Sequence, residues 1–528
     1  MAQVSKIDSN VTGLSYAEEA SLKTLPGTPI WYPLEPNSYA DFGGEITTVA
    51  RNPINPSRQR KKGVVTDLDA SGGFNTDLTQ TNLQDMLQGF FFASLRRKGE
   101  AKNAPGASTL LFSVTNSNKL ITRSGTPALD LTTQFATNDL VYVTGFSNAA
   151  NNGLFALGNV TATTIQLIEA NYNQDPPSLV DEANASGVSI TVVGHLSAEV
   201  LTVDVSGSRP AFTHSGASTD FTTWGLVPGE WVFVGGDLAG TAWTNSANNG
   251  FARVRSITAT RLEFDKTAGT MVSETGTTIA PAVFFGRVLK NELGSNIVRR
   301  SYQLERTLGA PDDSNLAQVQ SEYLVGAIPN EFTINFATAD KVTCDLSFVA
   351  TDNEQRTGVQ GIKAGTRIPL TESDAFNTSS DVARIKLATV DSNSNPSPLF
   401  AFATDVTITI NNNVTPNKAI GTLGAFDATA GTFQVSGNIT AYFANVTAVQ
   451  AVRNNSDITL DMHMVKANSG VSVDLPLISL GDGRANIEQD APITLPLTKE
   501  AATGAKIDPN LDYTMMMVFW DYLPDLAS

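Results

Sequence analysis

The stretch from Gly63-Val64-Val65 to Leu95 decides how this sequence is interpreted. Its apolar run is followed by Asp69-Ala70-Ser71-Gly72-Gly73, whose Asp, Ser and Gly residues are typical of a tight turn. A short polar strand comes next. The helical run over 83–95 then carries apolar residues three and four positions apart, which predicts one apolar face packed against a sheet.

The same order of elements returns near residue 421. Gly421-Thr422-Leu423 precedes a predicted turn over 427–431, a strand over 433–440 and a helical run over 441–452. The chain therefore contains one β-rich module twice. Because two similar surfaces can occupy equivalent places in a ring, the duplication predicts a structural building block.

Length and composition narrow the class of protein. The 528 residues predict about three to four domains. Charged residues make up 16%, below the roughly 25% of ordinary soluble domains, and Thr, Ser, Asn and Gly take their place, as in secreted or virion β-proteins. The net charge of −17 argues against nucleic-acid binding over the whole surface, because phosphate neutralisation needs clustered Lys and Arg.

Alternating apolar and polar residues dominate the remaining sequence, for example over 332–336, 406–410 and 458–464. This pattern predicts half-buried antiparallel strands. The clearest helix is predicted over 82–98, with Arg96, Arg97 and Lys98 near its C-terminal end. We therefore predict a mainly β protein of two tandem modules, each with a flanking helix.

A second repeat lies between the two halves of the first module. Ala150-Asn151-Asn152-Gly153 recurs as Ala247-Asn248-Asn249-Gly250, and the alignment continues without a gap over 160–167 and 257–264. Residues 104–281 therefore predict two small inserted β-domains. Asn-Asn-Gly is typical of a tight turn, which explains the motif without a binding role.

These patterns predict five segments along the chain. They are 1–103 (first part of module 1), 104–198 and 199–282 (inserted β-domains), 283–380 (second part of module 1 with a connector) and 381–528 (module 2).

The single cysteine, Cys344, excludes an intrachain disulfide, and its place in an alternating strand predicts a buried side chain. The segment 1–15 lacks the apolar core of a signal peptide. Apolar runs such as 515–520 are too short to span a membrane. We therefore expect assembly in the cytosol without membrane contact.

Motifs typical of catalytic, metal-binding or cofactor-binding sites are missing from the sequence. We therefore predict no enzyme, no metal and no cofactor. The three histidines, His195, His214 and His463, lack the spacing of a zinc site. Asp67 to Gly72 resembles the start of a calcium loop, but Leu78 stands where that loop requires Glu. No phosphate-binding loop or dinucleotide fingerprint occurs.

One basic cluster stands out in this acidic chain, between the strands predicted near Ile46 and Val64. Two interpretations remain open for it: a solvated exposed loop, or contact with an acidic patch on a neighbouring copy. Nucleic-acid binding ranks last, because no aromatic residue interleaves with the charges. The candidate contact residues are Arg51, Arg58, Arg60, Lys61 and Lys62.

Four stretches in a fixed order resemble the major tail tube protein of long-tailed bacteriophages, of the two-module type. Together they cover most of residues 10–103 and 283–528, and the insertion lies outside this shared core. The stretches are Tyr16-Ala17-Glu18-Glu19 with Gly27-Thr28-Pro29 and Trp31-Tyr32-Pro33-Leu34; Ser301-Tyr302-Gln303-Leu304-Glu305-Arg306 with Tyr323-Leu324-Val325-Gly326 and Asn330-Glu331-Phe332; Ile410-Asn411-Asn412-Asn413 with Gly421; and Phe519-Trp520-Asp521.

The resemblance implies a structural virion protein that self-assembles in the host cytoplasm. Its modules would be β-sandwiches with a flanking helix, joined edge to edge in rings that stack through loops and arms. The channel would conduct genome DNA during ejection without binding it specifically. The implied partners are further copies of the chain, a tape measure protein, and tail terminator and distal tail proteins. Two modules per chain favour trimeric, pseudo-hexameric rings, with a homohexamer as the alternative.

The resemblance also implies that the insertion decorates the outside of the tube, so we expect it to be removable. A channel that conducts DNA should not bind phosphates, which predicts an acidic or neutral wall. The lumen-facing candidates, taken from the polar faces of predicted strands, are Glu305, Asp345, Asp461 and Asp474.

The main rival function is a capsid decoration or tail fibre protein with a glycan-binding β-domain. Trp224, Trp231 and Trp243 cluster in the second inserted domain and predict either such a site or the core of a small β-domain. A carbohydrate-active enzyme would also need paired carboxylates near aromatic platforms.

Overall fold

The computed structural model describes residues 7, 12–54, 56, 59–103, 109–126, 128–168, 179–277, 279–309, 319–371, 373–390, 398–399, 402–443 and 445–527. Within this part of the chain, strands dominate and two α-helices occur, which confirms the mainly β fold class. The chain divides into two compact units. Unit 1 comprises Met1–Ala93, Gly294–Ala375 and Asp405–Asn438; unit 2 comprises Ser94–Leu293, Phe376–Thr404 and Ile439–Ser528.

Unit 1 contains a broad antiparallel sheet. Its strands follow one another in the order β3, β4, β23, β22, β27 and β30. Inward-facing apolar residues such as Phe332, Ile334 and Phe348 build the core on one face. The bounds are β3 (Pro36–Arg51), β4 (Lys61–Asp77), β22 (Gln320–Ala337), β23 (Thr343–Ala350), β27 (Ala403–Asn411) and β30 (Gln434–Tyr442).

The turn predicted over 69–73 is wrong, because these residues lie inside the continuous strand β4. Gly72 and Gly73 serve close packing there instead of chain reversal. A Cβ on Gly73 would lie 2.5 Å from the backbone oxygen of Leu346, and one on Gly72 would lie 2.5 Å from Leu324. The second predicted turn, over 427–431, is also displaced, since β29 (Ala425–Thr429) occupies most of it and pairs with β28 (Thr415–Lys418).

The remaining strands of unit 1 adjoin the N-terminal half of β22. In this half, β22 pairs with β21 and β24. The core of this part contains Ala17, Trp31, Tyr323 and Val325. The bounds are β1 (Gly13–Glu18), β2 (Ile30–Leu34), β21 (Tyr302–Gly309), β24 (Asp352–Thr357) and β25 (Thr366–Arg367).

The helix α1 (Gln84–Phe91) confirms the first predicted helix but is shorter than 82–98. It packs Phe90 against Phe332 and Phe348, with ring centroids 5.8 and 5.3 Å apart. The helix ends because Phe92 adopts a left-handed conformation with φ of 49°. The three basic residues 96–98 therefore do not lie in its last turn.

Unit 2 contains the insertion, whose short strands pair antiparallel with one another and with their flanking neighbours β5 and β19 in one sheet. The strands are β5 (Glu100–Lys102), β6 (Leu111–Thr115), β7 (Leu120–Ser124), β8 (Asp139–Thr144), β9 (Gly153–Val160), β10 (Thr164–Leu167), β11 (Glu182–Ala185), β12 (Ser189–Leu196), β13 (Thr202–Asp204), β14 (Ala211–Thr213), β15 (Trp231–Val234), β16 (Gly250–Thr258), β17 (Arg261–Lys266), β18 (Glu274–Thr275) and β19 (Ala282–Phe285).

The two Asn-Asn-Gly copies close with the same hydrogen bonds. Asn152 accepts from the backbone N–H of Phe146 at 2.9 Å, and Asn249 accepts from that of Trp243 at 2.9 Å. In each copy a glutamate accepts from the two backbone N–H groups that precede the motif, Glu182 in the first and Glu274 in the second. The amide side chains therefore serve the turn itself.

The rest of unit 2 is a sheet in which β31 pairs with β26 and β32, and β34 pairs with β32 and β20. The helix α2 (Thr447–Arg453) lies within the second predicted helical run, apart from its last residue. The bounds are β20 (Arg287–Lys290), β26 (Val382–Thr389), β31 (Ile458–Lys466), β32 (Ser469–Asp482), β33 (Thr494–Ala502) and β34 (Met516–Trp520).

The compact units group the chain differently from the five predicted segments. Residues 405–438, predicted as part of module 2, cluster with unit 1, and the insertion clusters with residues 439–528. The predicted domain boundaries stay a prediction. In the described residues, no helix is long and apolar enough to cross a membrane.

Candidate functional site: a polar sheet face and a projecting ribbon

One face of the broad sheet in unit 1 is covered by short polar and acidic side chains. A row of directly paired positions crosses five strands: Ser38, Asn75, Asp345, Thr333 and Thr409. Their neighbours two positions along each strand share this face, because side chains alternate. We call this surface the polar face. It comprises Ser38, Asn75, Asp77, Glu331, Thr333, Asn335, Thr343, Asp345, Ser347, Asp405, Thr407, Thr409, Gln434, Ser436 and Asn438.

Hydrogen bonds hold these side chains against the sheet. Asp345 accepts from the amide groups of Asn75 and Asn335, at 2.7 Å each. The hydroxyl groups of Thr333 and Thr409 lie 3.0 Å apart. None of the positions on the polar face is Lys or Arg. These positions are therefore neutral or acidic, and Lys341 reaches the edge of the face by pairing with Asp77 at 2.7 Å.

Of the four acidic candidates, the structure places Asp345 alone on this exposed face. The prediction does not hold for the other three, because Glu305, Asp461 and Asp474 are buried, each 1% exposed. Alternation does place them opposite the apolar residues of their strands, but both faces of those strands are covered. A carboxylate buried by its own chain cannot line a channel.

Each of the three buried carboxylates pairs with an arginine. Arg367 holds Glu305 with two hydrogen bonds of 2.7 and 2.8 Å. Arg384 pairs with Asp461 at 2.6 Å. Arg253 pairs with Asp474 at 3.0 Å. These partners could not be found from the sequence, because they lie 62 to 221 positions away from the carboxylates or on strands whose pairing was not predicted.

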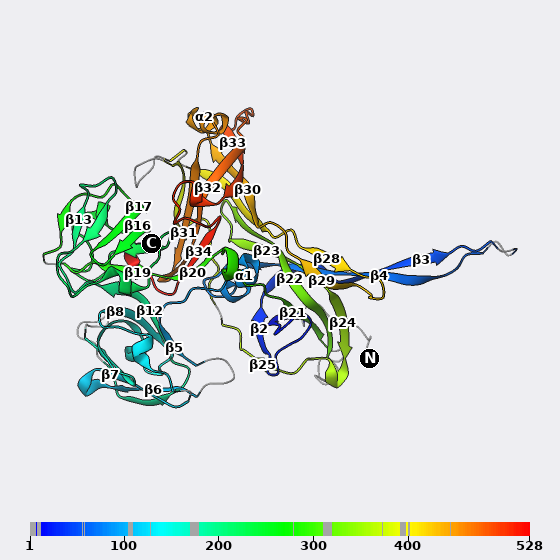
Figure 1. Ribbon diagram of the computed structural model, residues 1–528, viewed down its shortest axis with the longest axis horizontal. Helices are drawn as coiled ribbons and strands as arrows, with labels where there is room; N and C mark the ends of the chain where they lie inside the picture. The colour runs from blue at the N-terminus through cyan, green and yellow to red at the C-terminus, as the bar shows by residue number, and fades with distance from the viewer. Residues whose placement is uncertain are drawn as a thin grey trace. The chain divides into compact units, whose positions relative to one another are not determined.

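The basic cluster occupies the end of a two-stranded ribbon and not a loop between separate strands. Past Leu68, β3 and β4 pair only with each other and extend away from the rest of unit 1, with Arg51 paired to Lys61 near the tip (Figure 1). Arg51, Arg60, Lys61 and Lys62 are exposed, and no described carboxylate forms an ion pair with them. Arg58 lies outside the described residues.

The ribbon also exposes apolar side chains: Ile46, Val49, Val64 and Val65 are each more than half exposed. At its root, Lys418 of β28 binds Asp67 and Asp69. The hydrogen bond from Lys418 lowers the pKa of Asp67. Because an isolated ribbon is only marginally stable in water, apolar residues and cations exposed together on it favour a protein contact.

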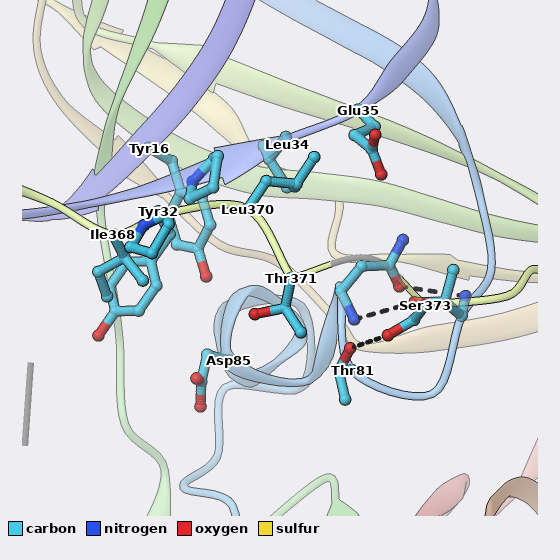
Figure 2. A pocket seen from close by; sticks show the side chains of 14 residues that line it. Tyr16, Tyr32, Leu34, Glu35, Thr81, Asp85, Ile368, Leu370, Thr371 and Ser373 are labelled. Atoms are coloured by element: carbon cyan, nitrogen blue, oxygen red, sulfur yellow. Dashed lines mark hydrogen bonds between the residues drawn. The ribbon is translucent and has the colours of Figure 1, made fainter. Parts of the chain in front are cut away.

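A small cavity of about 130 Å³ lies near the start of α1 (Figure 2). Tyr16 and Tyr32 stack on its wall with ring centroids 5.3 Å apart, and the hydroxyl groups of Thr81 and Ser373 meet at 2.9 Å. Burial raises the pKa of Tyr16 well above its ordinary value.

The tryptophans considered for glycan binding are core residues. Trp224, Trp231 and Trp243 are 5%, 0% and 3% exposed. Trp243 packs on Phe212, and Trp224 packs edge-on against Phe221. Their rings therefore form no exposed platform. In the part of the chain that the structure describes, no three His, Cys, Asp or Glu residues gather as a metal site would require.

These features define a mainly β protein whose unit 1 carries an exposed two-stranded ribbon. The family model of the phage tail tube protein matches residues 9–501, and the chain belongs to that family. The resemblance drawn from the four stretches is thus confirmed. The protein is a structural component of the phage tail in the virion and not an enzyme. A search of curated proteins found no match.

Sequence reasoning missed the polar face as a whole. A signal for it was present, since the residues between the apolar ones in 332–336, 343–347 and 406–410 are Thr, Asn, Ser or Asp. Only the strand order brings these segments side by side.

Proposed function

We propose that copies of this chain form stacked rings and that the polar face of unit 1 lines a central channel for genome DNA. The composition of that face carries the proposal. Duplex DNA presents closely spaced phosphates along its whole length, so each lysine or arginine on a channel wall would act as a binding site. Asp345 and Asp405 would repel phosphates, and the hydroxyl and amide groups would keep the wall hydrated.

The basic end of the β3–β4 ribbon is proposed as the contact between adjacent rings. Arg51, Arg60, Lys61 and Lys62, with Arg58 beside them in sequence, would meet carboxylates on the next copy. The net charge of −17 makes acidic surface plentiful on every copy. Two modules per chain favour trimeric rings over hexamers of chains. The tape measure, tail terminator and distal tail proteins are the proposed partners along and at the ends of the tube.

The experiment that tests the conduit compares two variants with the same change of charge. Asp345→Lys places a cation on the polar face. Asp181→Lys places one at an exposed position of the insertion, outside that face. Both variants are expected to form tubes in negative-stain microscopy. Phage assembled with Asp345→Lys should eject DNA more slowly, and more so at low salt, where screening is weakest.

Equal ejection rates for the two variants would contradict the assignment of the polar face to the channel. Purified wild-type protein that forms neither rings nor tubes in the microscope, at any concentration tried, would contradict self-assembly.

A further inference from the structure

We propose that the inserted pair of β-domains is an obligate structural layer of the sheet formed by β31, β32 and β34, and not a removable appendage. The proposal replaces our expectation that residues 104–281 could be deleted without harm. It rests on contacts within unit 2 alone and is independent of the proposed channel.

The first observation is that two strands at this junction, β15 and β19, are buried on both faces. In β15, Val232 and Val234 belong to the core within the insertion, whereas Trp231 and Phe233 belong to a second core on the opposite face. β19, which directly follows residue 281, repeats this arrangement, with Val283 and Phe285 on one side and Ala282 and Phe284 on the other. A sheet that was free on its outer face would carry polar residues at alternate positions.

The second core is shared between the insertion and the C-terminal strands. Both inserted domains contribute to it, the first through Leu140, Leu154 and Ala156. From β34, Met516, Val518 and Trp520 enter the same core, and all five residues of that strand are buried. Removing the insertion would expose these side chains together. An apolar strand exposed in this way is prone to aggregation.

The second observation is a cluster of buried charges across the same junction. Arg253 of β16 binds Asp265 at 2.8 Å and Asp474 at 3.0 Å. Lys266 of β17 lies 3.1 Å from Asp474 and 3.3 Å from Asp461. Four of these five side chains are no more than 3% exposed, and Asp265 is 7% exposed.

Arg384 and Tyr513 complete this cluster. Arg384 pairs with Asp461 at 2.6 Å, and the Tyr513 hydroxyl donates to Asp474 at 2.7 Å. The cluster then contains three cations and three carboxylates and is electrically balanced. Without the insertion, Arg384 alone would remain to balance Asp461 and Asp474. An unbalanced charge in a protein interior is strongly destabilising, so the sheet depends on the cations that the insertion supplies.

The third observation is an aromatic contact at the same junction. His463 of β31 is fully buried and stacks on Phe251 of the insertion, with ring centroids 4.1 Å apart and planes 4° from parallel. Trp231 meets the same imidazole edge-on at 4.5 Å. The apolar core, the charge cluster and the aromatic stack therefore all join the insertion to β31, β32 and β34.

A double-mutant cycle in the full-length chain tests the proposal. Lys266→Met and Asp474→Asn are made singly and together, and the unfolding equilibrium is measured in denaturant. The double variant leaves Arg253 with Asp265 and Arg384 with Asp461, so charge balance is restored. Each single variant is expected to lower the ratio of folded to unfolded protein about a hundredfold or more, and the double variant to recover most of that loss.

The matched control is Arg261→Met, on the same strand as Lys266. Arg261 pairs with Asp204 inside the insertion, 2.6 Å apart, and both side chains remain about 30% exposed. Its loss should change the folding equilibrium little. Effects of Lys266→Met as small as those of the control, or effects that simply add in the double variant, would overturn the proposal.

Replacing residues 104–281 with a short Gly-Ser linker provides a second test. The expected result is loss of hydrogen-exchange protection over β31, β32 and β34, or insoluble protein. A soluble deletion variant that keeps native protection in these strands would show that the insertion is dispensable. Both measurements follow folding and not tube formation, so failure of the proposed channel would leave their outcome unchanged.

Discussion

Arg253 and Asp474 lie 221 positions apart in the chain, and their guanidinium and carboxylate groups meet at 3.0 Å with both side chains buried. This pair connects a strand of the insertion to a strand of the C-terminal sheet. Burial opposes ionisation of Asp474, but Lys266 and Arg253 outweigh it and lower the pKa of this carboxyl. The ion pair therefore stays charged throughout the neutral and mildly acidic range.

The stability of the protein should depend on pH through His463. Burial lowers the pKa of this imidazole from its ordinary 6.5 to about 3. Between these values the unfolded chain binds a proton that the folded protein does not, so stability falls as the pH falls. The loss from this residue should reach about 1.6 kcal/mol between pH 6.5 and pH 5. Denaturant unfolding at several pH values should show this slope, and His463→Phe should flatten it.

The buried carboxylates change the stability of the protein in a separate, more acidic pH range. Burial opposes the charge of Asp461, but Arg384 and Lys266 hold its pKa well below the ordinary 3.8. The stabilising effect of the ionised carboxylates is therefore complete above about pH 4 and lost only in stronger acid. A slope between pH 6.5 and pH 5 that persists in His463→Phe would contradict the assignment to the imidazole.

Arg367→Met should destabilise unit 1 by about 3 kcal/mol, because it leaves the buried carboxylate of Glu305 without its cation. Arg367 also lies over the ring of Trp31, 5.2 Å from its centroid. The control is Arg356→Met, which removes a partly exposed ion pair with Glu354 and should cost at most about 1 kcal/mol. Equal losses in denaturant unfolding would show that Glu305 is not held as described.

Gly73→Ala should destabilise the broad sheet by about 2 kcal/mol, because the new Cβ would meet the backbone oxygen of Leu346. The matched control is Gly27→Ala, where an added Cβ would have no atom within 4 Å. Thermal unfolding should separate the two variants. A Gly73→Ala protein as stable as Gly27→Ala would mean that β4 and β23 are further apart than the structure shows.

Reversing the basic end of the ribbon, with Arg51, Arg60, Lys61 and Lys62 all changed to Glu, should weaken stacking more than folding. These side chains are exposed in the single chain, so thermal unfolding of the monomer should change little. Tubes should become shorter in micrographs and dissociate at lower salt than the wild type. Unchanged tube length and salt stability would remove the ribbon from the inter-ring contact.

Native mass spectrometry of the assembled rings should give three chains per ring if the two modules occupy equivalent positions. Six chains per ring would show that the duplicated elements are not equivalent in assembly.

The sequence by itself determined the class of protein. Alternating apolar residues in 332–336 and 406–410 specified strands. Successive side chains of a strand point to opposite faces, so apolar residues at every second position bury one face and leave the other polar. The ordered stretches around Tyr16, Ser301 and Asn411 identified the family. These signals are local or depend only on order along the chain, so they can be recognised without coordinates.

Tertiary structure decided which polar residues meet solvent. Asp345 and Asp461 have the same local pattern, each between apolar neighbours, yet one is exposed and the other is 1% exposed. The difference arises because the insertion, whose Lys266 lies 195 positions before Asp461, covers one strand, whereas the described residues of unit 1 leave the other exposed. A strand sequence encodes its two faces, whereas what packs on each face depends on long-range contacts that no local pattern records.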